Sequence, residues 1–171
     1  MQWSGVRESR LVDDRLLTAW EDWERARPRD ERALTRAAFH RLLTGQATGL
    51  AVLSAALGLP DATVAETVRS MVVQGLATAD GERVTGVGGL SVVAAPHALT
   101  WNGRSYWTWC ALDAIGIAAA IGGTVVVHSR TEPAGEAVQL TFEDGMWMDP
   151  DPQLGIRLTE PQVARPLCGG T

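Results

Sequence analysis

The sequence of 171 residues contains only two cysteines, no excess of basic residues and no long hydrophobic run. Two cysteines cannot form the disulfide framework of a small secreted domain. Lys and Arg number 15 against 20 Asp and Glu, and no segment concentrates positive charge, so the electrostatic footprint of a typical nucleic-acid-binding protein is missing. We therefore expect no nucleic acid among its partners.

Membrane and export signals are also missing from the sequence. The longest apolar run, residues 109–121, contains Asp113 and is too short to cross a bilayer. The N-terminal residues carry charges throughout and lack the apolar segment of a signal peptide. These absences predict a cytoplasmic protein with reduced thiols and no membrane partner.

The composition that is present, 46% apolar and 20% charged, is that of an ordinary globular protein. Residues 11–27 predict an amphipathic helix, and a second helix is expected over 33–43. Two apolar stripes within residues 50–75 predict a helix pair around the turn GLPDAT, with Asp61 or Thr63 as the N-cap of the second helix. The Asp-Gly hairpin that follows completes the pattern of a winged helix-turn-helix.

The C-terminal half has a different character. Residues 97–109 predict two strands around an Asn-Gly turn, and a helix begins near Cys110 and ends at a Gly-Gly pair. Three further strands are expected at TVVVHSR, AVQLTF and LGIRLTE. The fold class is α+β, in which a winged-helix-like module precedes a small mixed β-sheet domain with one central helix. We expect an N-terminal helix and linker at 1–33, the winged module at 34–90 and the mixed β-sheet domain at 91–171.

Cys110 and Asp113 are the residues with the clearest chemical potential. Residues three apart lie on one face of a helix, with Cβ atoms about 5–6 Å apart. The start of a helix favours a thiolate, whereas apolar surroundings and a neighbouring carboxylate oppose it. Such a conflict is expected where a proton is shared or transferred. The alternative is a buried structural cysteine with Asp113 as a capping residue.

The second thiol, Cys168, lies three residues before the end of the sequence. It is either a loose terminal thiol or the partner of Cys110 in a two-thiolate site for a soft metal ion. Structural zinc requires four ligands, so two sulfurs without a nearby His pair fit a linearly coordinated ion better, and Hg(II) is the softest candidate.

The remaining polar residues suggest structural roles. His97 and His128 are expected to be structural imidazoles, His40 to be exposed or to cap its helix, and Ser129 lacks the Gly-x-Ser-x-Gly context of a hydrolase. No dinucleotide-binding or P-loop motif is present. The acidic pairs Glu143-Asp144 and Asp149-Asp151 predict solvated turns.

Three tryptophans, Trp101, Trp107 and Trp109, are spaced so that they would share one face of a strand. Core packing explains them, and walling the thiol pocket is the functional alternative.

The run HALTWNGRSYWTWCALDAIGIAAAIGGTVVVHSRTEPAGEAVQL resembles the central segment of alkylmercury (organomercurial) lyases. The resemblance rests on an aromatic strand, the turn Gly103-Arg104, the motif Trp-Cys-Ala-Leu-Asp over residues 109–113, and the helix end at Gly122. Upstream, TGVGGLSV and the winged module are similar to the N-terminal region of that family. The resemblance covers about residues 34–168.

This resemblance implies protonolysis of a carbon–mercury bond in an organomercurial small molecule. By carry-over, Cys110 is the attacking thiolate, Cys168 the second coordinating thiol, and Asp113 the proton donor and occasional mercury ligand. No cofactor is required, Hg(II) is the product, and cellular thiols are co-reactants. The Hg(II) would leave by thiol exchange or by transfer to a mercuric reductase, and the enzyme would be a monomer or homodimer.

The sequence departs from the family pattern in two places. Members of the family continue with a strand and a helix after the second catalytic cysteine, whereas this sequence stops three residues after Cys168, so a truncated or trimmed relative with an open site is expected. Thr131 stands near the position of a further structural cysteine of the family.

Two alternatives remain open beside the lyase. One is a relative with the lyase fold that is inactive or has other chemistry. The other is a winged-helix regulator that senses a metal or a thiol-reactive molecule through its cysteines. A regulator needs a basic recognition surface, but the candidate helix offers Arg69 against Glu66 and the wing offers Arg83 against Glu82.

Overall fold

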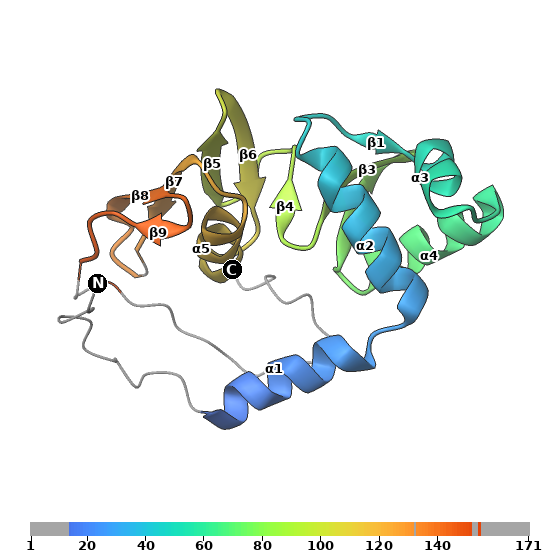
Figure 1. Cartoon of the computed structure of the whole chain (residues 1–171), viewed down its shortest axis with the longest axis horizontal. Helices are drawn as coiled ribbons and strands as arrows, with labels where there is room; N and C mark the ends of the chain where they lie inside the picture. The colour runs from blue at the N-terminus through green and yellow to red at the C-terminus, as the bar shows by residue number, and fades with distance from the viewer. Residues whose placement is uncertain (1–13, 132, 152–153, 155–171) are drawn as a thin grey trace.

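The computed structural model describes residues 14–131, 133–151 and 154 of the chain (Figure 1). The helices are α1 (Asp14–Ala26), α2 (Arg29–Leu42), α3 (Leu50–Leu57), α4 (Asp61–Val73) and α5 (Ala111–Ala120). The strands are β1 (Thr48–Gly49), β2 (Ala77–Asp80), β3 (Arg83–Val87), β4 (Leu90–Ser91), β5 (His97–Trp101), β6 (Arg104–Thr108), β7 (Thr124–Arg130), β8 (Ala137–Glu143) and β9 (Met146–Trp147).

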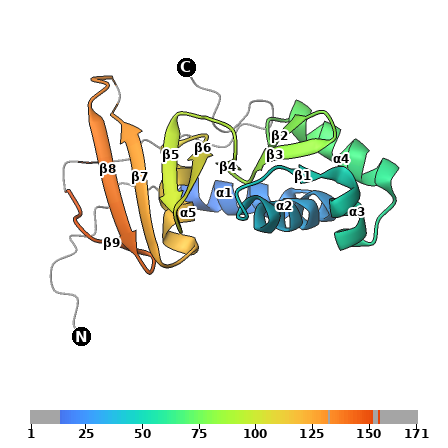
Figure 2. The same ribbon diagram turned by 90° about the horizontal axis from the view of Figure 1, so that it is seen from above.

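One antiparallel sheet runs through the described part of the chain in the order β1-β3-β4-β6-β5-β7-β8-β9, with β2 paired to β3. Helices α2, α3 and α4 gather at the β1–β3 end, and α5 packs against β5, β6 and β7 (Figures 1 and 2). This arrangement confirms the α+β class. Helix α5 lies near the middle of the sheet, and β4 joins the β1–β3 end of the sheet to the β6–β9 end.

Both predicted hairpins are present. Strands β2 and β3 pair across Gly81, and β5 and β6 pair across Asn102 and Gly103, which adopt φ values of 50° and 72°. A two-residue turn with positive φ at both positions matches the twist of the flanking strands, which is why Asn-Gly is favoured there. The β5–β6 hairpin leads directly into α5.

Helix α2 begins at Arg29, four residues before the predicted start at residue 33, and this prediction was wrong. Pro28 takes the N-cap position with φ −52° and ψ 144°, and the acidic residues Asp30 and Glu31 fall in the first turn, where the helix dipole favours them. The charged run therefore starts the helix. The N-cap of α4 is likewise Pro60, whereas Asp61 is the first helical residue and Thr63 the third.

Strands β7 and β8 confirm two of the three strands expected after α5. The third, LGIRLTE, lies outside the described residues except for Leu154. The short strand β9 was not predicted, and it pairs with β8 through Phe142 and Trp147.

A single group of buried side chains joins the helical end to the α5 end. It includes Leu34, Leu42, Leu53 and Met71 from the helices and Leu99, Tyr106, Val125 and Val127 from the sheet. Tyr106 is fully buried, and its hydroxyl donates to the Leu43 carbonyl over 2.6 Å. This bond fixes β6 to the end of α2. No single described helix is long and apolar enough to span a membrane; α3 and α4 reach that length and apolarity only as a pair bent by 114°.

Arg27 links α1 to α2 through a buried ion pair. Its side chain is 10% exposed, its Nε lies 3.8 Å from the Glu31 carboxylate, and its guanidinium stacks 5.5 Å from the Trp23 ring. Removal of one partner of a buried pair leaves the other charge uncompensated. We expect Arg27→Ala to lower the free energy of unfolding in urea by about 3 kcal/mol.

Arg25→Ala is the matched control, because Arg25 pairs with Glu21 and Asp22 on the surface and is 65% exposed. Exposed pairs contribute at most about 1 kcal/mol. Equal losses in the two variants would contradict a structural role for the Arg27–Glu31 pair.

Candidate functional site

The structure brings Cys110 and Asp113 into direct contact at the start of α5. Cys110 is the N-cap residue, with φ −142° and ψ 168°, and follows the β6 strand. Its Sγ accepts a hydrogen bond from the backbone N–H of Asp113 over 3.4 Å and donates one to Asp113 Oδ2 over 3.1 Å. Both side chains are partly buried. The sequence predicted that Cys110 is part of the first helical turn, whereas in the structure Cys110 precedes that turn as its N-cap.

The electrostatics of this position favour negative charge. The first backbone N–H groups of a helix have no intrahelical acceptor and carry the positive end of the dipole. Sulfur and carboxylate both lie at that end, and the hydrogen bond between them holds one proton between two acids. The pair can therefore transfer a proton from sulfur to oxygen without rearrangement.

Gly89 is a site residue that the sequence reasoning did not single out. It lies in the turn between β3 and β4 with φ +81°, and its carbonyl accepts a hydrogen bond from the Trp109 N–H over 3.3 Å. A Cβ built on Gly89 would overlap the carboxyl group of Asp113 and lie 2.7 Å from Asp113 Cβ. The Gly-Gly pair in TGVGGLSV was a visible turn signal, but its contact with Asp113 depends on the fold.

His97 and Ser129 form the other polar contact on this sheet. His97 Nδ1 lies 2.6 Å from Ser129 Oγ, a contact between β5 and β7, and this bond agrees with a structural imidazole. His40 and His128 are exposed. The acidic turns are also exposed, and Asp144 Oδ1 accepts from the Gly123 N–H.

The three tryptophans do not share one face, so that prediction was wrong. Leu99 pairs with Tyr106, which places Trp101 on the same face as Tyr106 and Trp107 on the opposite face. Trp101 Nε1 donates to the Gly122 carbonyl at the far end of α5. The spacing misled because Trp101 and Trp107 lie on different strands of a hairpin.

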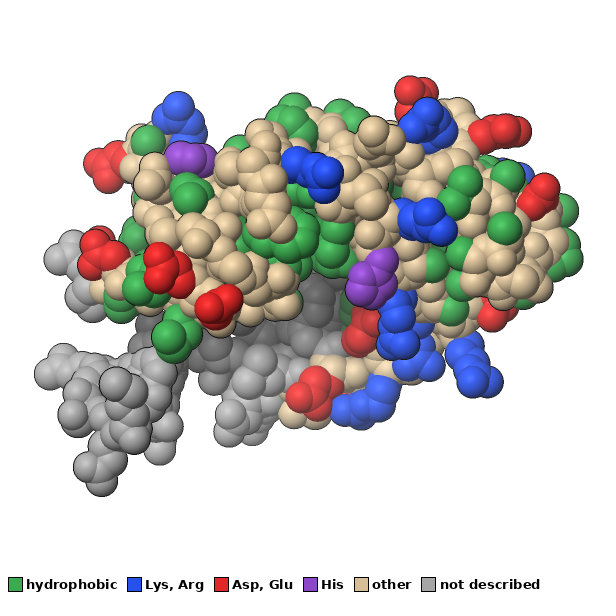
Figure 3. All heavy atoms as spheres, turned by 45° about the horizontal axis from the view of Figure 1, so that its top comes forward, with side chains coloured by type: hydrophobic (Ala, Val, Ile, Leu, Met, Phe, Trp, Pro, Cys, Tyr) green, Lys and Arg blue, Asp and Glu red, His purple; other side chains and the backbone are tan. Residues whose placement is uncertain are grey.

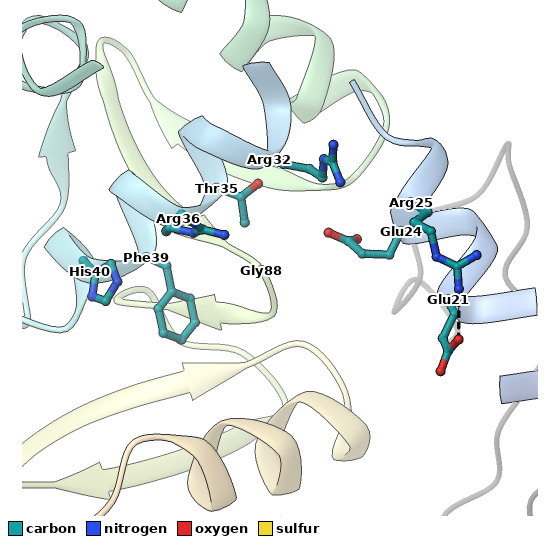
Figure 4. Close-up of a pocket in the computed structure, with 9 residues that line it drawn as sticks. All are labelled: Glu21, Glu24, Arg25, Arg32, Thr35, Arg36, Phe39, His40 and Gly88. Carbon is teal, nitrogen blue, oxygen red and sulfur yellow. Dashed lines mark hydrogen bonds and ion pairs between the residues drawn. The ribbon is translucent and has the colours of Figure 1, made fainter. Parts of the chain in front are cut away.

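A groove lies between α1 and α2 (Figure 4). Its lining combines charged residues of both signs with one aromatic ring: Glu21, Glu24, Arg25, Arg32, Thr35, Arg36, Phe39, His40 and Gly88. Cys110 and Asp113 are not among them, whereas Gly88, the chain neighbour of Gly89, is. In Figure 3 basic side chains lie mainly over the helical end, with acidic ones among them.

Within the described residues no group of three or more His, Cys, Asp or Glu side chains could hold a metal ion. Cys168, the predicted second thiol, lies outside those residues. The site as described is therefore a thiol and a carboxyl at a helix N-terminus, backed by a glycine turn.

Comparison with known proteins gives a match over this half of the chain. A family model described as alkylmercury lyase matches residues 90–168. An alkylmercury lyase of Staphylococcus epidermidis is 35% identical over 74 residues, which are 43% of this chain and 34% of that protein. An alkylmercury lyase of Pseudomonas putida is 42% identical over 53 residues, which are 31% of this chain and 25% of that protein. The chain spans about a third of the length of the first of these curated relatives.

A solved structure extends the likeness in fold to most of the chain. The crystal structure of the mercury-bound form of MerB2 covers 93% of this chain and 78% of its own, with a TM-score of 0.78 and 22% sequence identity. At this identity the likeness shows a shared fold. The segment matched by the family model contains Cys110 and Asp113, and it ends at Cys168.

Proposed function

We propose that this chain, whose residues 90–168 match the alkylmercury lyase family model, is a member of that family and cleaves the carbon–mercury bond of organomercurials to give a hydrocarbon and Hg(II). The observation that carries the proposal is the 3.1 Å hydrogen bond from Cys110 Sγ to Asp113 Oδ2. This bond supports the proposal because the reaction needs a soft nucleophile for mercury and a proton donor for the adjacent carbon, and the two candidate groups are in contact inside the segment that the family model matches.

The reaction starts with the transfer of the Cys110 proton to Asp113. The Cys110 thiolate then forms a sulfur–mercury bond and displaces the ligand X of R–Hg–X. A second thiolate adds to mercury, which increases the electron density on the bound carbon. Asp113 delivers its proton to that carbon, the Hg–C bond breaks, and R–H leaves while mercury stays bound to two sulfurs. Overall, R–Hg–X and two thiols give R–H, HX and a mercury dithiolate.

The second thiolate in this scheme is assigned to Cys168, on its place in the matched segment. Cellular thiols would exchange with the bound Hg(II), or a mercuric reductase would accept it, in the reducing cytoplasm. Side chains and thiols supply every group that the scheme uses. Monomer and homodimer are both compatible with the scheme.

The N-terminal elements are proposed to form a winged-helix-like packing module. Helices α3 and α4 with the β2–β3 hairpin have the element order of such a module, and they are buried against α2. A role in DNA recognition is disfavoured because Arg83, one of the few basic residues available, donates from Nη2 to the Ala47 carbonyl over 2.8 Å. The division at residues 33 and 90 stays a proposal, although residue 33 lies inside α2 and the sheet continues through β4 into β6.

The test is detection of benzene by gas chromatography after incubation of the purified chain with phenylmercury and excess thiol. The same reaction in D₂O should give monodeuterobenzene, because the proton on the thiol–carboxyl pair exchanges with solvent. Thiol alone and heat-denatured protein are the controls. Tight Hg(II) binding without benzene would overturn the lyase proposal and favour a binding protein or a sensor.

A further inference from the structure

We infer that Gly89 is a positioning residue that holds the Asp113 carboxyl against the Cys110 thiol. For its effect on turnover this inference rests on the proposed function. The geometric part stands on the described residues alone. Gly89 does not take part in the chemistry, and it acts only through Asp113.

The Gly88–Gly89 turn lies between two helices. A Cβ on Gly88, which has φ +59°, would lie 3.4 Å from Thr35 Cγ2 and 3.5 Å from Phe39 Cδ2 of α2, which is ordinary van der Waals contact. A Cβ on Gly89 would instead meet α5, and its three nearest atoms are all in Asp113. Adjacent glycines with the same type of backbone thus face different helices.

The contact restricts where the Asp113 side chain can go. On one side the carboxyl occupies the space that a Cβ on Gly89 would fill, and on the other it accepts from Cys110 Sγ. The turn is itself fixed, because the Gly89 carbonyl accepts from the Trp109 N–H immediately before Cys110. A side chain at position 89 would have to displace the carboxyl from this place. Displacement of a reacting group by about 1 Å can cost about a hundredfold in rate.

Gly88→Ala and Gly89→Ala form a matched pair for the test. Both place alanine at a left-handed backbone position, so both lose similar stability for that reason. Only Gly89→Ala collides with Asp113. We expect kcat for benzene formation to fall about a hundredfold in Gly89→Ala with KM little changed, and to stay within about threefold of wild type in Gly88→Ala. Equal kcat in the two variants would overturn the inference.

A second readout does not need turnover. The chain has two cysteines, so a Cys168→Ser background leaves Cys110 as its single thiol. In that background the pH profile of Cys110 alkylation by iodoacetamide should shift in Gly89→Ala toward the profile of Asp113→Ala, and should be unchanged in Gly88→Ala. A wild-type profile in Gly89→Ala would refute the positioning role. If the unmodified chain releases no benzene, the proposed function fails, but this profile still decides the role of Gly89.

If Gly89→Ala fails to fold, a double variant distinguishes a collision with Asp113 from another cause. Adding Asp113→Gly removes the three atoms nearest to the new methyl group. If the collision with Asp113 causes the loss, Gly89→Ala/Asp113→Gly should melt within a few degrees of Asp113→Gly alone. A double variant that stays unfolded while Asp113→Gly folds would show that Gly89 is needed for another reason.

Discussion

Asp113→Asn will keep mercury bound and lose most of the release of hydrocarbon. Asparagine has nearly the same shape as aspartate, so it fits against Gly89. Its backbone N–H still donates to the Cys110 sulfur, which caps the helix. Its amide cannot take the thiol proton and pass it to carbon. Loss of a positioned general acid typically costs about 10²–10⁴-fold in rate. Single-turnover release of benzene from protein-bound phenylmercury measures this step directly.

Asp149→Asn is the control for this variant, because it makes the same chemical change on an exposed side chain. We expect its rate to equal that of wild type. Undiminished benzene release by Asp113→Asn would remove Asp113 from the role of acid. Loss of mercury binding together with turnover would instead assign Asp113 a role as a ligand.

The cost of Asp113→Asn in stability should be small. An acidic residue in the first turn of a helix contributes about 0.3–1 kcal/mol through the helix dipole. The expected change in the free energy of unfolding is therefore within that range, which a urea titration can measure. A small loss of stability beside a large loss of rate separates a chemical role from a structural one.

Local signals account for what the sequence predicted correctly around the site. The Asn102-Gly103 turn determines the β5–β6 hairpin, since it is the dipeptide that a two-residue hairpin turn favours. The apolar run after Cys110, ended at Gly122, determines α5. Together they bring Cys110 to the N-cap of α5 and Asp113 into its first turn, so the three-residue spacing predicted that the two side chains are close, whereas the form of the contact, through the cap, was not predicted.

The features that the sequence did not predict depend on contacts between distant segments or on the choice between competing caps. Gly89 touches Asp113 only because β4 pairs with β6 and so aligns its turn with the start of α5. The faces of Trp101 and Trp107 depend on the hairpin register, which places them on different strands. The start of α2 was misplaced because a charged run after a proline can either break a helix or begin one.

Cys110→Ser is expected to abolish turnover without unfolding the protein. The Cys110 side chain is an N-cap acceptor for the Asp113 N–H, and serine is among the residues most favoured at that position. The stability of the variant should therefore equal or exceed that of wild type, by up to about 1 kcal/mol. A urea titration of both proteins measures the difference.

The same substitution should sharply weaken the reaction with mercury, although it preserves the stability of the protein. A hydroxyl oxygen is a hard ligand and is not ionised at neutral pH, so it can neither attack R–Hg–X nor hold the soft metal as sulfur does. We expect benzene release to fall to the rate of thiol alone and the affinity for phenylmercury to fall with it. Cys168→Ser, measured in parallel, tests the second thiol: slower turnover with Cys110 intact is expected if Cys168 completes the mercury dithiolate. Residual enzymatic release in Cys110→Ser would mean that a group other than the Cys110 thiol attacks mercury. Because serine caps α5 correctly, a loss of release in this variant is not explained by misfolding.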